Sequence, residues 1–416
     1  MCNFYAYTQM LGTSKIMKTS IEKGREGEEY VNDLAYKSFF KYWCYPNPLD
    51  EKGDKKEICD LLVLFKNICV IVSVKNYKNT GNITRYIKKT VGKSIKQISG
   101  AERKLFSYPR DVFIKHPNRE IEQFQRQNYE QVYRLIVNVG DSIEMQVLEA
   151  KTTTGELITV FNRDIFDAVM LYLDTISDFV DYLKAREVLL NKFSQSLMFG
   201  TENDLLAVYL ENQRTFPDTM TEIDADMVVL DLENKWKKFQ LEFDEKIRRK
   251  RKDEKASRIL DVFLEDNLLT AKNGPSIVKE YLSLNRLQRR MFSNSLQKFI
   301  ELHKGRKSSS TGHRNFSIDN FGVSFFYHGP EVSNESFVET VLQAIMVKFS
   351  MTENHSNEHL LGLGINENGG MSKVGYINSR MITKEIEKTT EQIIKELGWF
   401  KNVKKKTDSI EEYPEE

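Results

Sequence analysis

The sequence predicts an α/β protein whose first domain consists of a helix, a β-hairpin, a second helix, a strand and a third helix. Two apolar runs at 57–65 and 68–75 flank a polar Lys66-Asn67 pair, which is typical of two strands joined by a tight turn. Residues 20–42 carry apolar side chains at the period of an amphipathic helix. Because both hairpin strands are apolar on both faces, we expect a mixed sheet that is flanked by helices on both sides.

The rest of the first domain follows from the same patterns. A helix with Val91, Ile98 and Leu105 on one face comes after the hairpin, and 133–139 reads as a buried strand. A long helix is expected to begin near Asn162 or Asp164 and to run toward Leu190. We therefore place the first domain at 1–195.

Two further domains and a tail are predicted beyond residue 195. Residues 196–310 are mainly helical and highly charged, and a Ser-rich linker at 308–312 ends them. A small α/β unit is expected at 311–400 and a disordered tail at 401–416. Within that unit we predict two strands and two helices, at 321–327 and 360–365 and at 335–349 and 383–397.

Composition limits the classes of function. In the 416 residues the formal net charge is only +1, so any affinity for nucleic acid must come from local basic patches. The densest basic run is 246–255, where Arg248, Arg249, Lys250 and Arg251 are candidate phosphate contacts; a solvated helix face is the alternative reading.

The same composition indicates a soluble, cytoplasmic protein. No apolar run approaches the length of about 18 residues that spans a bilayer, and residues 1–20 lack the pattern of a signal peptide. The four cysteines show no metal-ligand spacing, and Cys59 and Cys69 are expected to be free thiols in the core.

The register of the hairpin brings its polar residues together. A two-residue turn pairs Phe65 with Ile68 and puts Asp60 opposite Ser73, with Cβ atoms roughly 5 Å apart. Lys75 shares the face of Ser73, because side chains alternate along a strand. Glu57 belongs to the opposite face unless the strand begins only at Asp60.

These residues resemble the motifs of the PD-(D/E)XK nuclease superfamily, which has the restriction-endonuclease-like fold. Gly24-Arg25-Glu26-Gly27-Glu28 is similar to the helix motif of the resolvase-like and Mrr-like branches. Asp60 matches the strand aspartate, and Ser73-Val74-Lys75 stands where (Glu/Gln)-x-Lys is usual. The resemblance covers roughly residues 20–140 and does not extend beyond 195.

The resemblance implies a metal-dependent nuclease that hydrolyses phosphodiester bonds, with DNA favoured over RNA as substrate. Glu28 and Asp60 would hold Mg²⁺ or Mn²⁺, and Lys75 would orient the attacking water or offset developing charge. Glu57 and Gln97 are candidate helpers, although a plain surface residue is the preferred reading of Gln97. By analogy the chain is a prokaryotic defence or restriction effector, with a homo-oligomer or a partner protein of such a system as candidate assemblies.

Ser73 departs from the family pattern, because a hydroxyl is a poorer ligand for a hard cation than a carboxylate. Three outcomes stay open: two carboxylates suffice, Glu57 or Glu29 joins the site, or the domain has lost catalysis and binds nucleic acid or a partner protein. Each residue also has a structural reading, with Asp60 as a turn cap, Glu28 as a solvated helix residue and Lys75 as an exposed strand end.

Overall fold

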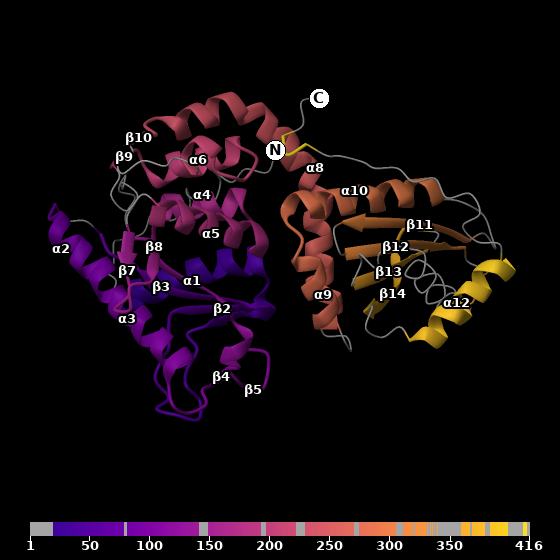
Figure 1. Ribbon diagram of the computed structural model, residues 1–416, viewed down its shortest axis with the longest axis horizontal. Coiled ribbons are helices and arrows are strands. Elements are labelled where there is room, and N and C mark those ends of the chain that lie inside the picture. Colours follow the sequence, from indigo (N-terminus) through magenta and orange to yellow (C-terminus); the bar gives the residue numbers. More distant parts are fainter. Residues whose placement is uncertain are drawn as a thin grey trace, which may run out of the picture. The chain divides into compact units, whose positions relative to one another are not determined.

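The computed structural model describes residues 20–416 apart from 79–80, 141–148, 193–196, 222–228, 270–273, 305–310, 319–320, most of 330–358, 367, 379–382, 398–410 and 414–416. The chain divides into two compact units, one formed by 1–37 with 43–167 and the other by 38–42 with 168–416. Figure 1 labels the helices and strands of both units.

The first unit is built from a mixed sheet and helices. Its elements in chain order are α1 (Ser20–Phe39, whose last two residues belong to the second unit), β1 (Cys44–Pro46), β2 (Leu61–Phe65), β3 (Ile68–Lys75), α2 (Ile83–Ile87), α3 (Lys93–Glu102), β4 (Phe113–Lys115), β5 (Ile121–Gln123), β6 (Gln131–Asn138), β7 (Glu149–Lys151) and β8 (Leu157–Asn162). A π-helical turn at Lys88–Gly92 joins α2 to α3, and another at Arg103–Ser107 follows α3.

The six-stranded sheet has the order β1-β2-β3-β6-β8-β7. Strands β3, β6 and β8 run parallel, and the other neighbours pair antiparallel. The sheet is therefore mixed, as predicted. The predicted hairpin register is also confirmed, because Phe65 pairs with Ile68 and Leu61 with Val72.

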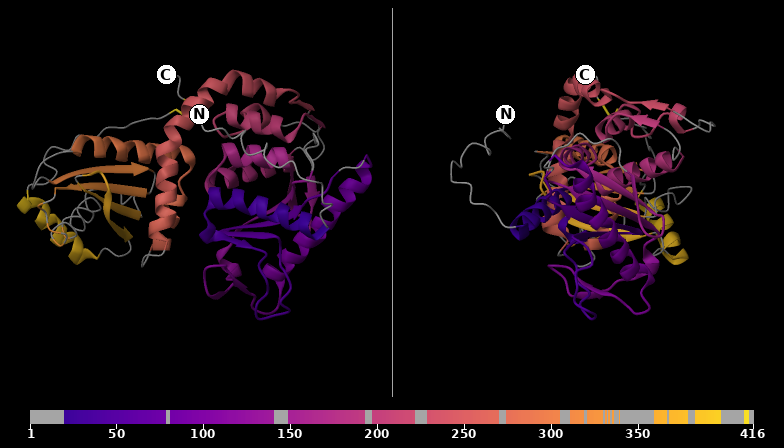
Figure 2. Two further views of the ribbon diagram at one scale, coloured as in Figure 1. Left: turned by 180° about the vertical axis from the view of Figure 1, so that it is seen from behind. Right: turned by 90° about the vertical axis from the view of Figure 1, so that its left-hand side faces the viewer.

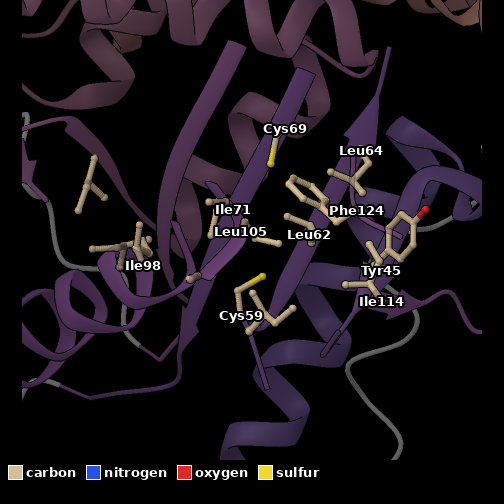
Figure 3. Packing of buried hydrophobic residues seen from close by; sticks show 14 of the residues in the cluster. Tyr45, Cys59, Leu62, Leu64, Cys69, Ile71, Ile98, Leu105, Ile114 and Phe124 are labelled. Carbon is tan, nitrogen blue, oxygen red and sulfur yellow. The ribbon is translucent and has the colours of Figure 1, made fainter. Parts of the chain in front are cut away.

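Helices cover both faces of this sheet. On one face Leu62 and Ile71 pack in a cluster with Ile98 and Leu105 from the stretch that contains α3 (Figure 3). On the other face α1 lies so close that a Cβ atom at Gly27 would be 3.0 Å from a methyl group of Val139. Cys59 and Cys69 are buried free thiols of the core, as predicted.

The second unit contains helices and a second sheet. Its elements are α5 (Ile176–Lys192), β9 (Leu197–Phe199), α6 (Glu202–Glu211), α7 (Asp218–Thr221), β10 (Val229–Asp231), α8 (Lys235–Leu268), α9 (Gly274–Leu282), α10 (Arg286–His303), β11 (Thr311–Ile318), β12 (Phe321–His328), β13 (His359–Ile365), β14 (Met371–Asn378) and α12 (Lys384–Leu397). The strands β11-β12-β13-β14 form one sheet in this order, and α10 contacts β11 and β12 (Figure 2).

The expected long helix at 162–190 is two helices. Asn162 caps the first one, α4 (Arg163–Tyr172), because its Oδ1 accepts from the Ile165 backbone N–H at 2.9 Å. The chain then breaks, and Thr175 caps α5 by accepting from the Asp178 N–H at 3.1 Å. The two-unit boundary at 167–168 lies within α4 rather than at 195, since α5 packs on α6 through Tyr182 and Tyr209.

Several predicted segments differ from the structure or lie outside the described residues. Thr311 and Gly312 begin β11 and are not linker, because their strand pairs with β12; residues 308–310 lie outside the description. The helix expected at 335–349 and tail residues 401–410 also lie mostly or wholly outside it. Among the described helices, none is long and apolar enough to cross a membrane.

Candidate active site

Asp60 lies at the open end of the hairpin, one residue before β2, and is 5% exposed. Its backbone N–H donates to the carbonyl of Val72, the partner of Leu61, at 3.2 Å, so Asp60 is tied to β3 although the regular pairing ends at Leu61. One carboxylate oxygen accepts from the Val74 backbone N–H, and the other accepts from the Gln97 side-chain amide at 2.8 Å. The Asp60 carboxylate is therefore fixed by the hairpin on one side and by α3 on the other.

Ser73 and Lys75 occupy the facing strand, as the register predicts. Ser73 is fully buried, and its Oγ lies 3.0 Å from the Ser94 hydroxyl and 2.9 Å from the Gln97 side-chain oxygen. Lys75 Nζ is 3.0 Å from Ser73 Oγ and 3.4 Å from Asp60 Oδ2. The cation of Lys75 thus points back into the cluster, and the reading of Lys75 as a solvated strand end is wrong.

Gln97 connects all three of these residues. Its amide nitrogen donates to Asp60, and its oxygen accepts from Lys75 Nζ at 3.0 Å and from Ser73. Ser94, one turn earlier on α3, was not predicted, although its spacing of three residues from Gln97 puts both on one helix face. Gln97 is therefore central to the cluster, and the alternative that it is a surface residue is wrong.

Glu28 approaches the same place from α1. Its carboxylate accepts from the Asn47 side-chain amide at 3.2 Å, just after β1. Burial raises the pKa of Glu28, and the negative charge of Asp60 adds to this rise while Asn47 and Lys75 oppose it. The Glu28 carboxylate therefore lies within electrostatic reach of Asp60 and Lys75, and it is not an isolated solvated residue.

Glu57 joins the cluster as well. Strand β2 begins only at Leu61, and Glu57 forms an isolated bridge with Leu49 before it. Glu57 therefore precedes the strand, and the alternation of strand side chains does not place it on the opposite face from Asp60. Glu57 is an exposed residue, but partial desolvation of its carboxyl, a hydrogen bond to Asp60 and the charges of Asp60 and Glu28 raise its pKa to about 7.

Asp60 and the Ser73 hydroxyl thus contact Lys75, and the Glu28 and Glu57 carboxyls lie within electrostatic reach of it. The carboxyls and the hydroxyl are oxygen donors, the ligand type that Mg²⁺ and Mn²⁺ prefer. Two of the carboxyls have pKa values raised in part by their neighbours, which indicates negative charge that a cation would offset. Within the described ranges no group of three or more His, Cys, Asp or Glu side chains could hold a metal ion together, so at most two of these carboxylates would share one. The donor chemistry fits a hard cation held by Asp60 with Glu28 or Glu57.

The candidate phosphate contacts on α8 belong to the second unit, and one of them has an internal role. Lys250 is buried and forms ion pairs with Glu412 and Glu254, so it is unavailable to a phosphate. Arg248 pairs with Asp244 at 2.6 Å and Arg249 with Glu245 at 3.6 Å. The basic run is largely a helix face whose charges are balanced by its own carboxylates, which favours the alternative reading.

Comparison with known proteins adds nothing to this geometry: no protein-family model, curated protein or solved structure matches the chain.

Proposed function

We propose that the chain is a metal-dependent nuclease that hydrolyses phosphodiester bonds, with DNA as the favoured substrate. The observation that carries the proposal is the convergence of Asp60, Lys75 and Gln97 with the carboxyl groups of Glu28 and Glu57 at one end of the β2–β3 hairpin. A half-buried lysine beside several carboxyls is a costly arrangement for stability alone, since each charge loses part of its solvation.

The residues of this cluster have distinct roles in the proposal. Asp60, with Glu28 or Glu57, would hold Mg²⁺ or Mn²⁺. A bound cation of this kind acidifies a water and offsets the negative charge that builds on a phosphate. Lys75 Nζ contributes a positive charge beside the reacting phosphate, and Gln97 fixes the orientation of both Asp60 and Lys75.

Glu57 is suited to hold or release a proton near neutral pH. A carboxyl with a pKa of about 7 is poised for general acid–base work, and its hydrogen bond to Asp60 links that proton to the cluster. In this role Glu57 does not bind the metal, and Glu28 and Asp60 are the two carboxylates that hold the cation. Such a site does not need a carboxylate at position 73, so it is compatible with Ser73.

A second candidate function is a non-catalytic module that binds nucleic acid or a protein partner. One observation favours it: both oxygens of Asp60 and the Ser73 hydroxyl are already engaged by protein groups. In that case the hydrogen bonds around Gln97 occupy the atoms that would otherwise bind a metal. Ser73 then stands where a metal-binding carboxylate has been lost.

The test is to incubate the purified full chain with plasmid, single-stranded DNA and RNA, with and without Mg²⁺ or Mn²⁺. The nuclease proposal predicts cation-dependent cleavage that Lys75→Ala abolishes. Lys115→Ala, at an exposed strand residue of the same unit, is the matched control and should cleave like the parent chain. Binding without cleavage under every condition would favour the second candidate.

A further inference from the structure

The second unit contains a pocket of about 970 Å³ that is separate from the cluster described above. Helices α5, α6 and α8 contribute to it, and its lining includes Asp181, Tyr209 and Phe243. Residues Glu411–Tyr413 form part of its wall. This segment falls within the tail predicted to be disordered, and for these three residues the prediction is wrong because specific contacts hold them.

Glu412 is the anchor of the segment. Its carboxylate accepts from Arg214 Nη2 at 2.8 Å and Nε at 3.2 Å, and it pairs with Lys250. Burial alone would raise the pKa of Glu412, but the positive charges of Arg214 and Lys250 hold it at about 2. The carboxylate is therefore ionised and is matched by two cations whose side chains are themselves nearly buried.

The neighbours of Glu412 are recognised in different ways. Arg290 donates to the backbone carbonyls of Glu411 and Glu412 and so binds the main chain of the segment. The Tyr413 ring packs edge-on against Phe243, with centroids 5.1 Å apart, and Lys250 Nζ lies 4.9 Å from the ring centroid. The Glu411 side chain is exposed, so the pocket selects the second glutamate and the aromatic residue.

The segment does not satisfy every polar group that it covers. Among the described residues, Arg290 Nε and the Tyr413 hydroxyl are buried without a hydrogen-bond partner. The segment is in neither a helix nor a strand, and among the described residues it is held by side-chain contacts and by its two carbonyls. The pocket volume beside it leaves room for a longer ligand.

We propose that this pocket is a peptide-binding site that recognises a glutamate followed by an aromatic residue. Glu412 and Tyr413 are its resident ligand, and a partner protein that presents the same pair in an accessible segment replaces them. The contacts support this class of ligand, because the pocket offers two cations for one carboxylate, an arginine for the main chain and an aromatic wall. The proposal does not depend on the nuclease activity.

Exchange is tested with a fluorescent peptide of sequence Ser-Ile-Glu-Glu-Tyr-Pro-Glu-Glu, which copies residues 409–416. The receptor is the full chain with Glu412→Ala and Tyr413→Ala, which empties the site. A resident ligand acts at an effective concentration of the order of millimolar, so the emptied chain should bind the peptide at least tenfold more tightly than the parent chain. Fluorescence anisotropy measures both affinities.

Matched peptides separate recognition from general charge attraction. Replacing the first glutamate by glutamine should leave affinity unchanged within a factor of two, whereas the same change at the second should weaken it at least tenfold. Equal weakening by both changes, or equal competition by a DNA oligonucleotide, would overturn the proposal in favour of a nonspecific anion site.

A second measurement keeps the proposal testable if the emptied chain does not fold. Fluorotyrosine placed at position 413 of the parent chain reports the buried ring by ¹⁹F NMR. Excess peptide should shift this resonance to that of a solvent-exposed tyrosine. A resonance that stays unchanged in millimolar peptide would show that the segment is a fixed part of the fold and would contradict exchange.

Discussion

Gln97 on α3 and Asp60 at the start of the hairpin are joined by a hydrogen bond of 2.8 Å from the amide nitrogen to the carboxylate. The other end of the same amide accepts from Lys75, so one neutral side chain sets the separation of the two charged groups. Because Gln97 holds both Asp60 and Lys75, the two charged groups keep a fixed geometry when substrate binds. Catalysis by electrostatic stabilisation requires such a fixed arrangement of charges.

The first prediction concerns this link. Gln97→Ala leaves one oxygen of Asp60 without its donor and removes one acceptor of Lys75 Nζ. We expect cleavage to fall roughly tenfold to a hundredfold, as lost charge-assisted hydrogen bonds of about 1.5–3 kcal/mol imply. Gln123→Ala, at an exposed position of β5, serves as the control in the same cleavage assay. Parent-like activity of Gln97→Ala would show that the hydrogen bond does not position the site.

The second prediction concerns Glu28. If this carboxylate holds the cation, Glu28→Gln should raise the Mg²⁺ concentration that gives half-maximal cleavage by about tenfold or more, since a neutral amide binds a hard cation more weakly. Glu26→Gln, two residues earlier on α1 with an exposed side chain, should leave the Mg²⁺ titration unchanged. Identical titrations for the two variants would remove Glu28 from the metal site.

The third prediction concerns Ser73. The Ser73 hydroxyl is buried against Ser94, Gln97 and Lys75. We expect Ser73→Ala to lower the free energy of unfolding by about 1–3 kcal/mol, because these partners lose a hydrogen bond. Urea unfolding measures this, and a change within experimental error would contradict it.

Ser73→Glu supplies the carboxylate that the family pattern has at this position. Next to Asp60 it adds like charge, so the variant should be less stable than the parent without metal and should regain stability in Mg²⁺. The measurement is the melting temperature with and without Mg²⁺. Destabilisation that Mg²⁺ fails to reverse would favour the non-catalytic candidate.

The fourth prediction concerns pH. Glu57 has an ordinary pKa of 4.5 when unfolded and about 7 when folded, so the folded chain binds the extra proton between these values. The contribution of Glu57 to stability is therefore full below about pH 4.5 and is lost as pH rises through about 7. Glu57→Gln should flatten this part of the stability profile of the metal-free chain, whereas Glu120→Gln, an exposed carboxylate, should not. A profile that Glu57→Gln leaves unchanged would contradict the assigned pKa.

The hairpin was predictable because strand alternation and a two-residue turn determine the register from Leu61 to Val72, which brings Asp60, Ser73 and Lys75 to the same end. The position of Glu57 was not, since it depends on where β2 begins and on the bridge from Glu57 to Leu49. The basic run could not reveal that Lys250 is buried, because its partner Glu412 lies far along the chain. Long-range ion pairs of this kind leave no periodic pattern in the sequence.

The helix break at Thr175 shows the same limit. Apolar periodicity continues across 162–190, but the Thr175 hydroxyl captures the Asp178 N–H and starts a new helix. Strand β8 ends at Asn162 and was not predicted, because this position was assigned to a helix start and the apolar run before it was not assigned to a strand.

The central claim is that a cation bound at Asp60 supports cleavage of nucleic acid. The most direct test compares the parent chain with Asp60→Asn, using Asp33→Asn on the exposed face of α1 as control, by plasmid cleavage in Mg²⁺ and by the shift in melting temperature that Mg²⁺ produces. The account predicts cleavage and a Mg²⁺-induced rise in melting temperature for the parent and the control, and the loss of both in a folded Asp60→Asn. Cleavage by Asp60→Asn at the parent rate would contradict it.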